Sequence, residues 1–470
     1  MNQEFMKKKP ILPLVISMAL PMTISMLVNA LYNIVDGYFV AKISEDAMTA
    51  LSLVFPLQNV LTAITVGFGI GINAVVAFYL GANDKKNADT AASLGMFFNI
   101  IHGVVLTVLF LTTIPVFLKL FTGNKDVISS GMQYSYVVFS FCIPVSISMT
   151  FEKTFQAVGR MKVSMICMMA GCVTNIILDP LFIFGAGFIP AMGIKGAAIA
   201  TVTGQCVTLL AYFLFYTFSS VPVRFSLKEL HFDGKICKKL YSIGIPAGLN
   251  MALPSLQVFV LNKILSVYQG GYVLVLGSYY KLQTFLYLTA NGVVQGMRPV
   301  LSFNYGAGEH KRVRNIFICS LSIIGIVMTL GTILCLIAPD RLIGIFSSNP
   351  DTIAIGVRAI RIISIGFIVS SIPVTISGAL EALGKGISSL IISILRYIGI
   401  MLLLACILNK VIGAQGVWHS FWITEFITAF AAVIIYKKLL RNHNLRFLIS
   451  EIYLSISVEA VAPSPTAVTT

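Results

Sequence analysis

The stretch YLGANDKK at residues 79–86 decides the organisation of the chain, because it recurs as NYGAGEHK at residues 304–311. Gly81 and Gly306 are 225 positions apart. Other pairs related by the same shift are Pro21 and Pro246, Gln58 and Gln283, and Gly159 and Gly384. Near the ends of the halves, Gly196 matches Gly416 at a shift of 220. A shift this constant predicts two structurally equivalent halves.

The composition predicts an all-α integral membrane protein. Hydrophobic residues make up 57% of the chain and charged residues 11%, whereas about a quarter of an ordinary soluble domain is charged. A spanning helix needs about 20 predominantly apolar residues. Runs of that kind predict twelve transmembrane helices near residues 11–40, 48–79, 91–118, 132–157, 163–184, 194–218, 236–266, 273–304, 314–338, 352–383, 387–408 and 416–438.

The loop charges predict the orientation and the domains. Although the net charge is +15, the cations lie in alternate loops, which is typical of membrane topology rather than of nucleic-acid binding. Both termini are therefore expected to be cytoplasmic. The predicted segments are a cytoplasmic N-terminus (1–10), two six-helix lobes (11–218 and 236–440), a cytoplasmic linker between them (219–235) and a disordered cytoplasmic tail (441–470).

The repeat also predicts where a functional site would lie. Each half has an even number of predicted spans, so both halves enter the membrane in the same direction. Parallel repeats of this kind are related by an axis along the membrane normal, and transporters built from them bind substrate between the halves. The architecture therefore favours a transporter that works by alternating access.

Polar residues in the first half define a candidate site. The stretch NIILDPLFIF (175–184) places Asp179 in an apolar run, one helical turn after Asn175. Asp179 lies about 24 Å along its span from the cytoplasmic end, and Asp36 and Thr201 reach a similar depth on other spans. An ionisable group there costs about 2.5–3.5 kcal/mol or more and normally faces a functional cavity. The alternative is a protonated Asp179 that bonds Asn175 and only holds helices together.

Several stretches resemble one family of transporters. LYNIVDGYFV, FYLGAND, NIILDPLFIFG followed by MGIKGAAIAT, and QGMRPVLSFNYGAGEHKRVR are similar in sequence and order to motifs of the MATE family, the multidrug and toxic compound extrusion transporters, in its bacterial drug-exporting branch. The resemblance covers about residues 10–440. It implies a multi-pass protein of a bacterial inner membrane, with a V of two six-helix lobes and export of organic, mainly cationic compounds driven by H⁺ or Na⁺ entry. It also implies a coupling-ion site at Asp36, Asn175, Asp179 and Thr201.

The second half lacks equivalent acids. A shift of 225 places Leu261 and Leu404 opposite Asp36 and Asp179, so ion coupling is expected in the N-terminal lobe alone. Arg298 and Lys281 are expected to be structural. Arg396 and Glu425 are candidates for a pair between the last two spans, and Glu152 and Lys153 are expected either to snorkel or to pair with each other. His102 and His419 are isolated in the sequence.

The resulting prediction is an ion-coupled antiporter, not an enzyme, with no cofactor or metal site and acting as a monomer on amphipathic compounds. Candidate residues of the substrate cleft are Asn29, Tyr32, Asn33, Gln58 and Gln283. The alternative on the same fold is a flippase for a lipid-linked precursor, which Lys263, Lys281, Arg298 and Arg396 would favour by making the cleft cationic. A channel would show filter-like loops or rings of pore residues, and a membrane enzyme a cluster of catalytic groups; neither signal is present in the sequence.

Overall fold

A computed structural model describes residues 4–187, 189–226, 232–268 and 270–459. The N-terminal lobe consists of α2 (Ile11–Ala41), α3 (Glu45–Gly81), α4 (Lys85–Phe121), α5 (Lys125–Phe139), α6 (Cys142–Ala157), α7 (Met161–Phe184) and α8 (Ile194–Phe218). The C-terminal lobe consists of α9 (Gly234–Leu265), α10 (Tyr272–Gly306), α11 (His310–Ile337), α13 (Pro350–Ala382), α14 (Gly386–Ile394), the π-helical turn η2 (Leu395–Gly399), α15 (Ile400–Ile412) and α16 (Ala414–Glu459). Two short helices, α1 (Phe5–Lys8) and α12 (Pro339–Gly344), complete the described chain.

The described chain forms the twelve expected spans. Ten helical segments are long and apolar enough to cross a membrane by themselves, with α14, η2 and α15 counted as one. The pair α5 and α6 passes the same test together. The twelfth span is the 35-residue α10, which carries Lys281 and Arg298 and packs against α2, α3, α11 and α13. Contacts inside the protein explain why this helix needs less apolar surface.

The fourth span differs from the single helix expected over 132–157. It consists of α5 and α6, bent by 47°. Pro144 lies in the first turn of α6 and has no N–H with which to bond the carbonyl of Ser140, so a continuous helix would lose that bond. The helix therefore breaks at residues 140 and 141.

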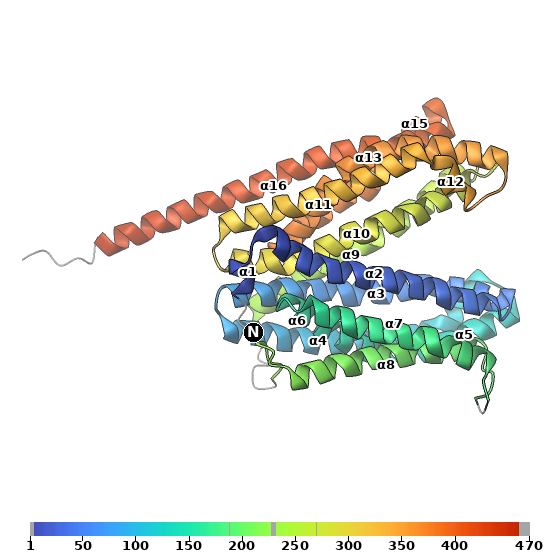
Figure 1. Cartoon of the computed structure of the whole chain (residues 1–470), viewed down its shortest axis with the longest axis horizontal. Helices are drawn as coiled ribbons and strands as arrows, with labels where there is room; N and C mark the ends of the chain where they lie inside the picture. The colour runs from blue at the N-terminus through green and yellow to red at the C-terminus, as the bar shows by residue number, and fades with distance from the viewer. Residues whose placement is uncertain (1–3, 188, 227–231, 269, 460–470) are drawn as a thin grey trace, which may run out of the picture.

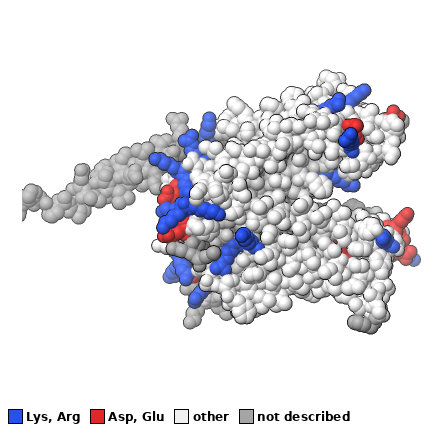
Figure 2. Space-filling view, in the orientation of Figure 1, with Lys and Arg blue, Asp and Glu red and all other residues white. Residues whose placement is uncertain are grey.

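The two lobes contact each other at one end and diverge toward the other (Figure 1). Lys and Arg side chains gather at the end where the lobes meet, next to α1 (Figure 2). We call it the basic end; its residues include Lys8, Lys85, Arg160, Lys311 and Lys385. The helices that join the lobes are α3 against α9, α2 against α10, and α3 against α10.

Glycines allow these helices to pack with their backbones in contact. A methyl group at Gly81 would lie 1.9 Å from the carbonyl oxygen of Phe303, and one at Gly306 would lie 2.0 Å from that of Phe78. Such small residues let membrane helices approach closely. Further glycines of the inter-lobe contact also obey the shift of 225, namely Gly67 and Gly292, and Gly71 and Gly296. We call this contact, made by the six glycines just named, the glycine seam.

The repeated motifs of the loops at the basic end have a backbone explanation. Asn83 (φ 57°) and Gly308 (φ 73°) occupy equivalent positions after Gly81 and Gly306, and both adopt the left-handed conformation. Only glycine, and less often Asn or Asp, adopts this conformation readily. The tight turns between α3 and α4 and between α10 and α11 therefore require the residues that make the two halves alike.

The N-terminal segment crosses the basic end and joins the lobes. Met6 is fully buried, and its carbonyl accepts hydrogen bonds from Asn304 Nδ2 (3.1 Å) and Arg312 Nε (3.1 Å). Arg312 also donates to the carbonyl of Lys9, and Lys7 forms an ion pair with Glu309 at 3.0 Å. Because residues 4–9 continue into α2 of the other lobe, these bonds tie one lobe to the other.

The predicted linker is described in part, and the predicted tail is described up to Glu459. Residues 219–226 and 232–233 connect α8 to α9, and 227–231 lie outside the described residues. The tail differs from the expected disorder after residue 440, because α16 continues as one helix to Glu459. The physical reason is that no Gly or Pro interrupts the sequence from 417 until Pro463. Residues 460–470 lie outside the described residues.

Candidate ion-coupling site and ligand cavities

The structure brings the four predicted coupling residues together from three helices. Asp36 comes from α2, Asn175 and Asp179 from α7, and Thr201 from α8. All four are buried, with exposures of 7%, 2%, 0% and 4% in that order. Asn175 Nδ2 donates to Thr201 Oγ1 at 3.4 Å, and the carboxyl groups of Asp36 and Asp179 lie within hydrogen-bonding reach of each other.

This cluster has more oxygen atoms than hydrogen-bond donors. Asp36 Oδ1, Asn175 Oδ1 and both carboxylate oxygens of Asp179 are buried without a donor among the described residues. Two carboxylates this close repel each other when both are ionised, and burial makes each charge more costly. The arrangement therefore suits a proton shared between the acids, or a hard cation held by the carboxylate, amide and hydroxyl oxygens.

Two tyrosines border the cluster. Tyr32 on α2 was predicted from the sequence, whereas Tyr134 on α5 was not; the side chains of both interact with Thr201. Gln58 Nε2 donates to the hydroxyl group of Tyr134 at 3.2 Å, which connects a predicted cleft residue on α3 to the acids. Sequence alone could not identify Tyr134, because no signal shows which face of α5 turns toward α7 and α8.

The other predicted cleft residues lie outside the group of four coupling residues. Asn29 and Asn33 are exposed on α2, and Asn33 Nδ2 donates to the carbonyl of Asn29 at 2.8 Å and to its Oδ1 at 3.3 Å. They are bonded to each other rather than to the four coupling residues. Gln283 lies in the C-terminal lobe, in a cavity shared with Arg396 and Glu425.

The C-terminal lobe has leucines at the positions equivalent to Asp36 and Asp179, and carries two ion pairs at other positions. Leu261, which is opposite Asp36, is fully buried. Arg396 Nη2 lies 2.7 Å from Glu425 Oε1, as the sequence predicted. Arg298 Nη2 lies 2.6 Å from Glu381 Oε2. The charges of both arginines are therefore balanced within the lobe.

The structure also shows the surroundings of the remaining lysines and of the two histidines singled out from the sequence. Lys263 and Lys281 are exposed, and Lys281 Nζ lies 5.6 Å from the ring centroid of Phe346. Lys153 Nζ lies 2.8 Å from Glu152 Oε1, which confirms their predicted pairing. The histidines are not isolated: Trp422 Nε1 donates to His419 Nδ1 at 3.0 Å, and His102 is hydrogen-bonded to Tyr241.

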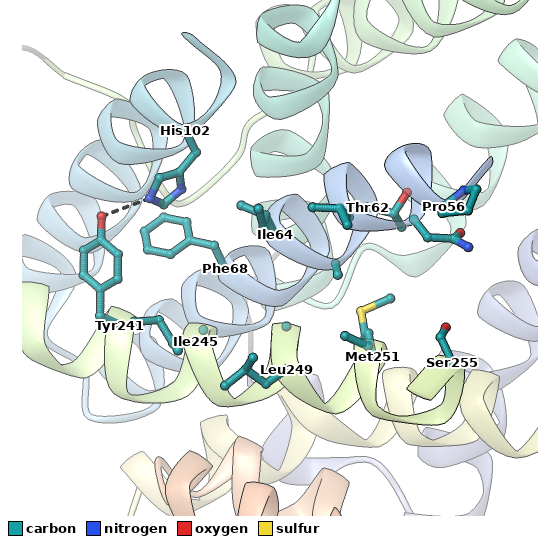
Figure 3. Close-up of a pocket in the computed structure, with 16 residues that line it drawn as sticks. Pro56, Thr62, Ile64, Phe68, His102, Tyr241, Ile245, Leu249, Met251 and Ser255 are labelled. Carbon is teal, nitrogen blue, oxygen red and sulfur yellow. Dashed lines mark hydrogen bonds between the residues drawn. The ribbon is translucent and has the colours of Figure 1, made fainter. Parts of the chain in front are cut away.

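A cavity of about 790 Å³ lies between the lobes, bounded by α3, α4 and α9. Figure 3 shows its mostly apolar lining, which includes Ile64, Phe68, Leu249 and Met251. At one end His102 Nε2 and the hydroxyl group of Tyr241 are hydrogen-bonded at 3.1 Å. The volume is within the range of drug-sized ligand pockets, and the lining suits an apolar ligand with few polar groups.

Comparisons with known proteins agree with this architecture. A family model described as MatE matches residues 21–181 and again 246–407, so the two matches start 225 positions apart. The multidrug export protein MepA of Staphylococcus aureus (strain MSSA476) is 25% identical over 432 residues, which is 92% of this chain and 94% of the relative.

Solved structures show the same fold. A structure of MATE in complex with MaD3S has a TM-score of 0.87 at 22% identity and covers 94% of this chain and 98% of its own. The outward-facing conformation of a multidrug resistance MATE family transporter of the MOP superfamily has a TM-score of 0.87 at 21% identity, with the same two coverages.

Proposed function

Because this chain belongs to the MATE family of transporters, we propose that it exports organic, mainly cationic compounds by exchange against an inward-moving ion. The observation that carries the proposal is the buried pair Asp36 and Asp179, with Asn175 and Thr201 beside it. An acidic site at membrane depth favours a cation. The export of several drugs is what the name of the S. aureus relative describes.

The coupling ion is proposed to act through a conformational switch at these carboxylates. Asp36 and Asp179 lie on different helices, so a proton bound between them holds α2 to α7. Loss of the proton restores the repulsion between the acids and changes the contacts between these helices. An ion can shift a conformational equilibrium only through such a difference in affinity for the two states.

We propose protons as the coupling ion. Burial disfavours the ionised form of each acid, and the neighbouring carboxylate disfavours it further. The two acids are expected to titrate as one coupled unit. The unbonded oxygens of Asn175 and Asp179 would also suit Na⁺, and the same residues would then form a sodium site.

The cavity of about 790 Å³ between α3, α4 and α9 is proposed to receive the apolar body of the substrate. Aromatic and methionine side chains such as Phe68 and Met251 can repack around different ligands. Broad specificity would follow from this lining. The glycine seam is proposed to close the basic end while substrate leaves from the opposite end.

The alternative function, a flippase for an anionic lipid-linked precursor, is less well supported. It would need uncompensated cations in the cleft. Instead, Arg298 and Arg396 are paired with Glu381 and Glu425, and Lys281 contacts an aromatic ring. The pairing of both arginines therefore favours the drug exporter.

Transport in proteoliposomes tests the proposal. The experiment follows a fluorescent organic cation under an inward proton gradient in sodium-free buffer, and separately under a sodium gradient. Proton-driven export is expected. No export without sodium, with full activity restored by sodium, would replace the proton with Na⁺ at the same residues. No export under either gradient would contradict the antiporter.

A further inference from the structure

A second cavity between the lobes, of about 200 Å³, lies at the basic end. Phe78 of α3 lines it from the N-terminal lobe, and Lys239 of α9 and Lys385, the residue before α14, line it from the C-terminal lobe. Pockets for drug-sized ligands measure about 300–1,000 Å³. This cavity therefore suits a smaller group than the cavity proposed for the exported compound.

The internal repeat shows that the equivalent place in the N-terminal lobe is filled by the chain itself. Gly384, which lines the cavity, corresponds to Gly159 at the shift of 225. A methyl group at Gly159 would lie 2.6 Å from Phe5 Cζ and 2.6 Å from Met6 Cε, whereas a methyl group at Gly384 would meet nothing within 4 Å. The N-terminal segment thus occupies on one side the place that forms a cavity on the other.

The contacts of the N-terminal segment show which kind of group fits such a place. The side chain of Met6 is fully buried and belongs to one apolar cluster with Leu14 and Met18 of the N-terminal lobe. The carbonyl oxygen of Met6 accepts hydrogen bonds from Asn304 and Arg312 of the C-terminal lobe. A group that joins the lobes here therefore combines apolar atoms with acceptor oxygens.

The cavity differs from its filled counterpart in charge. Lys239 corresponds to the buried Leu14 at the shift of 225. Neither Lys239 nor Lys385 forms an ion pair with a carboxylate among the described residues. Lys239 Nζ donates to the hydroxyl group of Tyr79 at 3.0 Å and lies 5.0 Å from the ring centroid of Phe78. These contacts hold the ammonium group in place without neutralising it, and two such cations favour an anion such as phosphate.

An apolar stripe leads from Lys385 toward the interior of the membrane. Ile387, Ile391 and Ile394 are exposed and follow one another on α14 at the spacing i, i+4 and i+7, so they share one face of the helix. Because α14 begins at the basic end, this stripe would lie beside the acyl chains of a lipid whose headgroup reaches the lysines. A free anion would make no contact with this surface.

We propose that this cavity binds the phosphate of an anionic phospholipid, and that the bound lipid holds the lobes together at the basic end. The phosphate oxygens accept hydrogen bonds from Lys239 and Lys385, and the acyl chains lie along α14. Basic pockets between transmembrane helices on the cytoplasmic side bind anionic headgroups in other membrane proteins.

The lipid acts here as a regulator of the conformational equilibrium. Because both lobes line the cavity, the lipid has its full set of contacts only while α3 and α9 lie together, and a ligand shifts an equilibrium toward the state that it binds more tightly. The lipid stays in its own leaflet, so this role differs from that of a flippase substrate. The inference is independent of which compound the protein exports.

Thermal unfolding of the purified full-length protein in detergent, with graded amounts of phosphatidylglycerol, tests the binding. Phosphatidylcholine with the same acyl chains is the comparison, because its choline group cancels the charge of the phosphate. We expect phosphatidylglycerol to stabilise at lower concentration than phosphatidylcholine, and inorganic phosphate to have no effect. Lys239→Gln and Lys385→Gln should each raise the concentration of phosphatidylglycerol needed for half-maximal stabilisation about fivefold, the usual effect of one lysine near an anionic membrane surface.

Lys238→Gln is the matched control, because Lys238 is the exposed neighbour of Lys239 on α9 and does not line the cavity. It removes the same charge from the same helix and should leave the half-maximal concentration unchanged. Lys385→Gln is the second test of the site, since Lys239→Gln also removes the hydrogen bond to Tyr79 and could unfold for that reason.

Distances between spin labels at exposed positions 86 and 311 test the effect on the lobes. In nanodiscs, phosphatidylglycerol in place of phosphatidylcholine should increase the share of short distances in the otherwise wild-type protein and should not do so in Lys385→Gln.

Four outcomes would overturn the inference. They are equal stabilisation by the two lipids, a half-maximal concentration that Lys385→Gln leaves unchanged or that Lys238→Gln raises equally, stabilisation by inorganic phosphate that depends on Lys385, and lipid binding without a change in the distances. None of these measurements requires export. A failure of the lipid site is therefore distinguishable from a failure of the proposed function.

Discussion

The glycine seam predicts that one methyl group changes which end of the protein is open. In Gly81→Ala the new Cβ would lie 1.9 Å from the carbonyl oxygen of Phe303, whereas ordinary contact begins at 3.4 Å, so the backbones must separate by about 1.5 Å. The obstructing atom belongs to the backbone of α10 and cannot rotate away. Overpacking of this kind costs about 1–3 kcal/mol.

This cost falls only on the conformation in which α3 and α10 touch. The equilibrium should therefore move about 5-fold to 150-fold toward a conformation in which the lobes separate at the basic end. Gly306→Ala should have a similar effect, because its Cβ would lie 2.0 Å from the carbonyl oxygen of Phe78. Transport should slow, because export requires the protein to return to the closed seam.

Distances between spin labels measure this shift. Labels at exposed positions 86 and 311 report on the basic end, and labels at exposed positions 125 and 351 on the opposite end, in a variant without native cysteines. We expect a longer distance at the first pair and a shorter one at the second. Gly325→Ala is the control, because a methyl group there meets nothing within 4 Å. If Gly81→Ala folds and its distances match those of Gly325→Ala, the reasoning about the seam is wrong.

Three further predictions concern the coupling acids, the N-terminal segment and the topology. Asp36→Asn and Asp179→Asn should each abolish coupled export in proteoliposomes but leave an inserted protein of near-wild-type thermal stability in detergent; loss of the fold together with transport would favour a packing role. Arg312→Ala removes charged hydrogen bonds to the N-terminal segment, worth about 1.5–3 kcal/mol each, and should speed tryptic cleavage at that segment; unchanged cleavage would contradict its role in joining the lobes. Single cysteines at Glu45 and His310 should be labelled by an impermeant thiol reagent from outside and inside respectively, and external labelling at 310 would overturn the proposed orientation.

The sequence was sufficient to predict the spans, because membrane length and the shift of 225 constrain them independently. It predicted the convergence of Asp36, Asn175, Asp179 and Thr201 because depth and helical phase can both be read from one helix at a time. The break at residues 140 and 141 could have been read from Pro144. In contrast, η2 depends on the packing of α14 and α15 against other helices, and no local pattern in LRYIG specifies it.

The residues that sequence reasoning missed share a different cause. Tyr134 and the pair His102 and Tyr241 are aromatic residues in apolar helices, where an aromatic side chain most often faces lipid or core. Their roles depend on which helix lies opposite, and a contact such as His102 with Tyr241 joins residues 139 positions apart. Only the packing of the lobes determines those neighbours.

The two halves remain alike where backbone meets backbone and differ where side chains would meet a ligand. A glycine of the seam cannot change without moving a helix of the opposite lobe. Gly67 lies against Gly248, and Gly292 lies against Thr23. The two contacts are equivalent, because Gly67 and Gly292 are 225 positions apart and so are Thr23 and Gly248. Asp36 and Asp179 have no such constraint, because Leu261 can fill the equivalent place in a buried core. The two lobes therefore share a symmetric glycine seam but carry different buried groups, the acids Asp36 and Asp179 in one and the arginine–glutamate pairs in the other. In the proposed antiporter, an ion that binds the acids of the N-terminal lobe therefore acts on a seam that both lobes share.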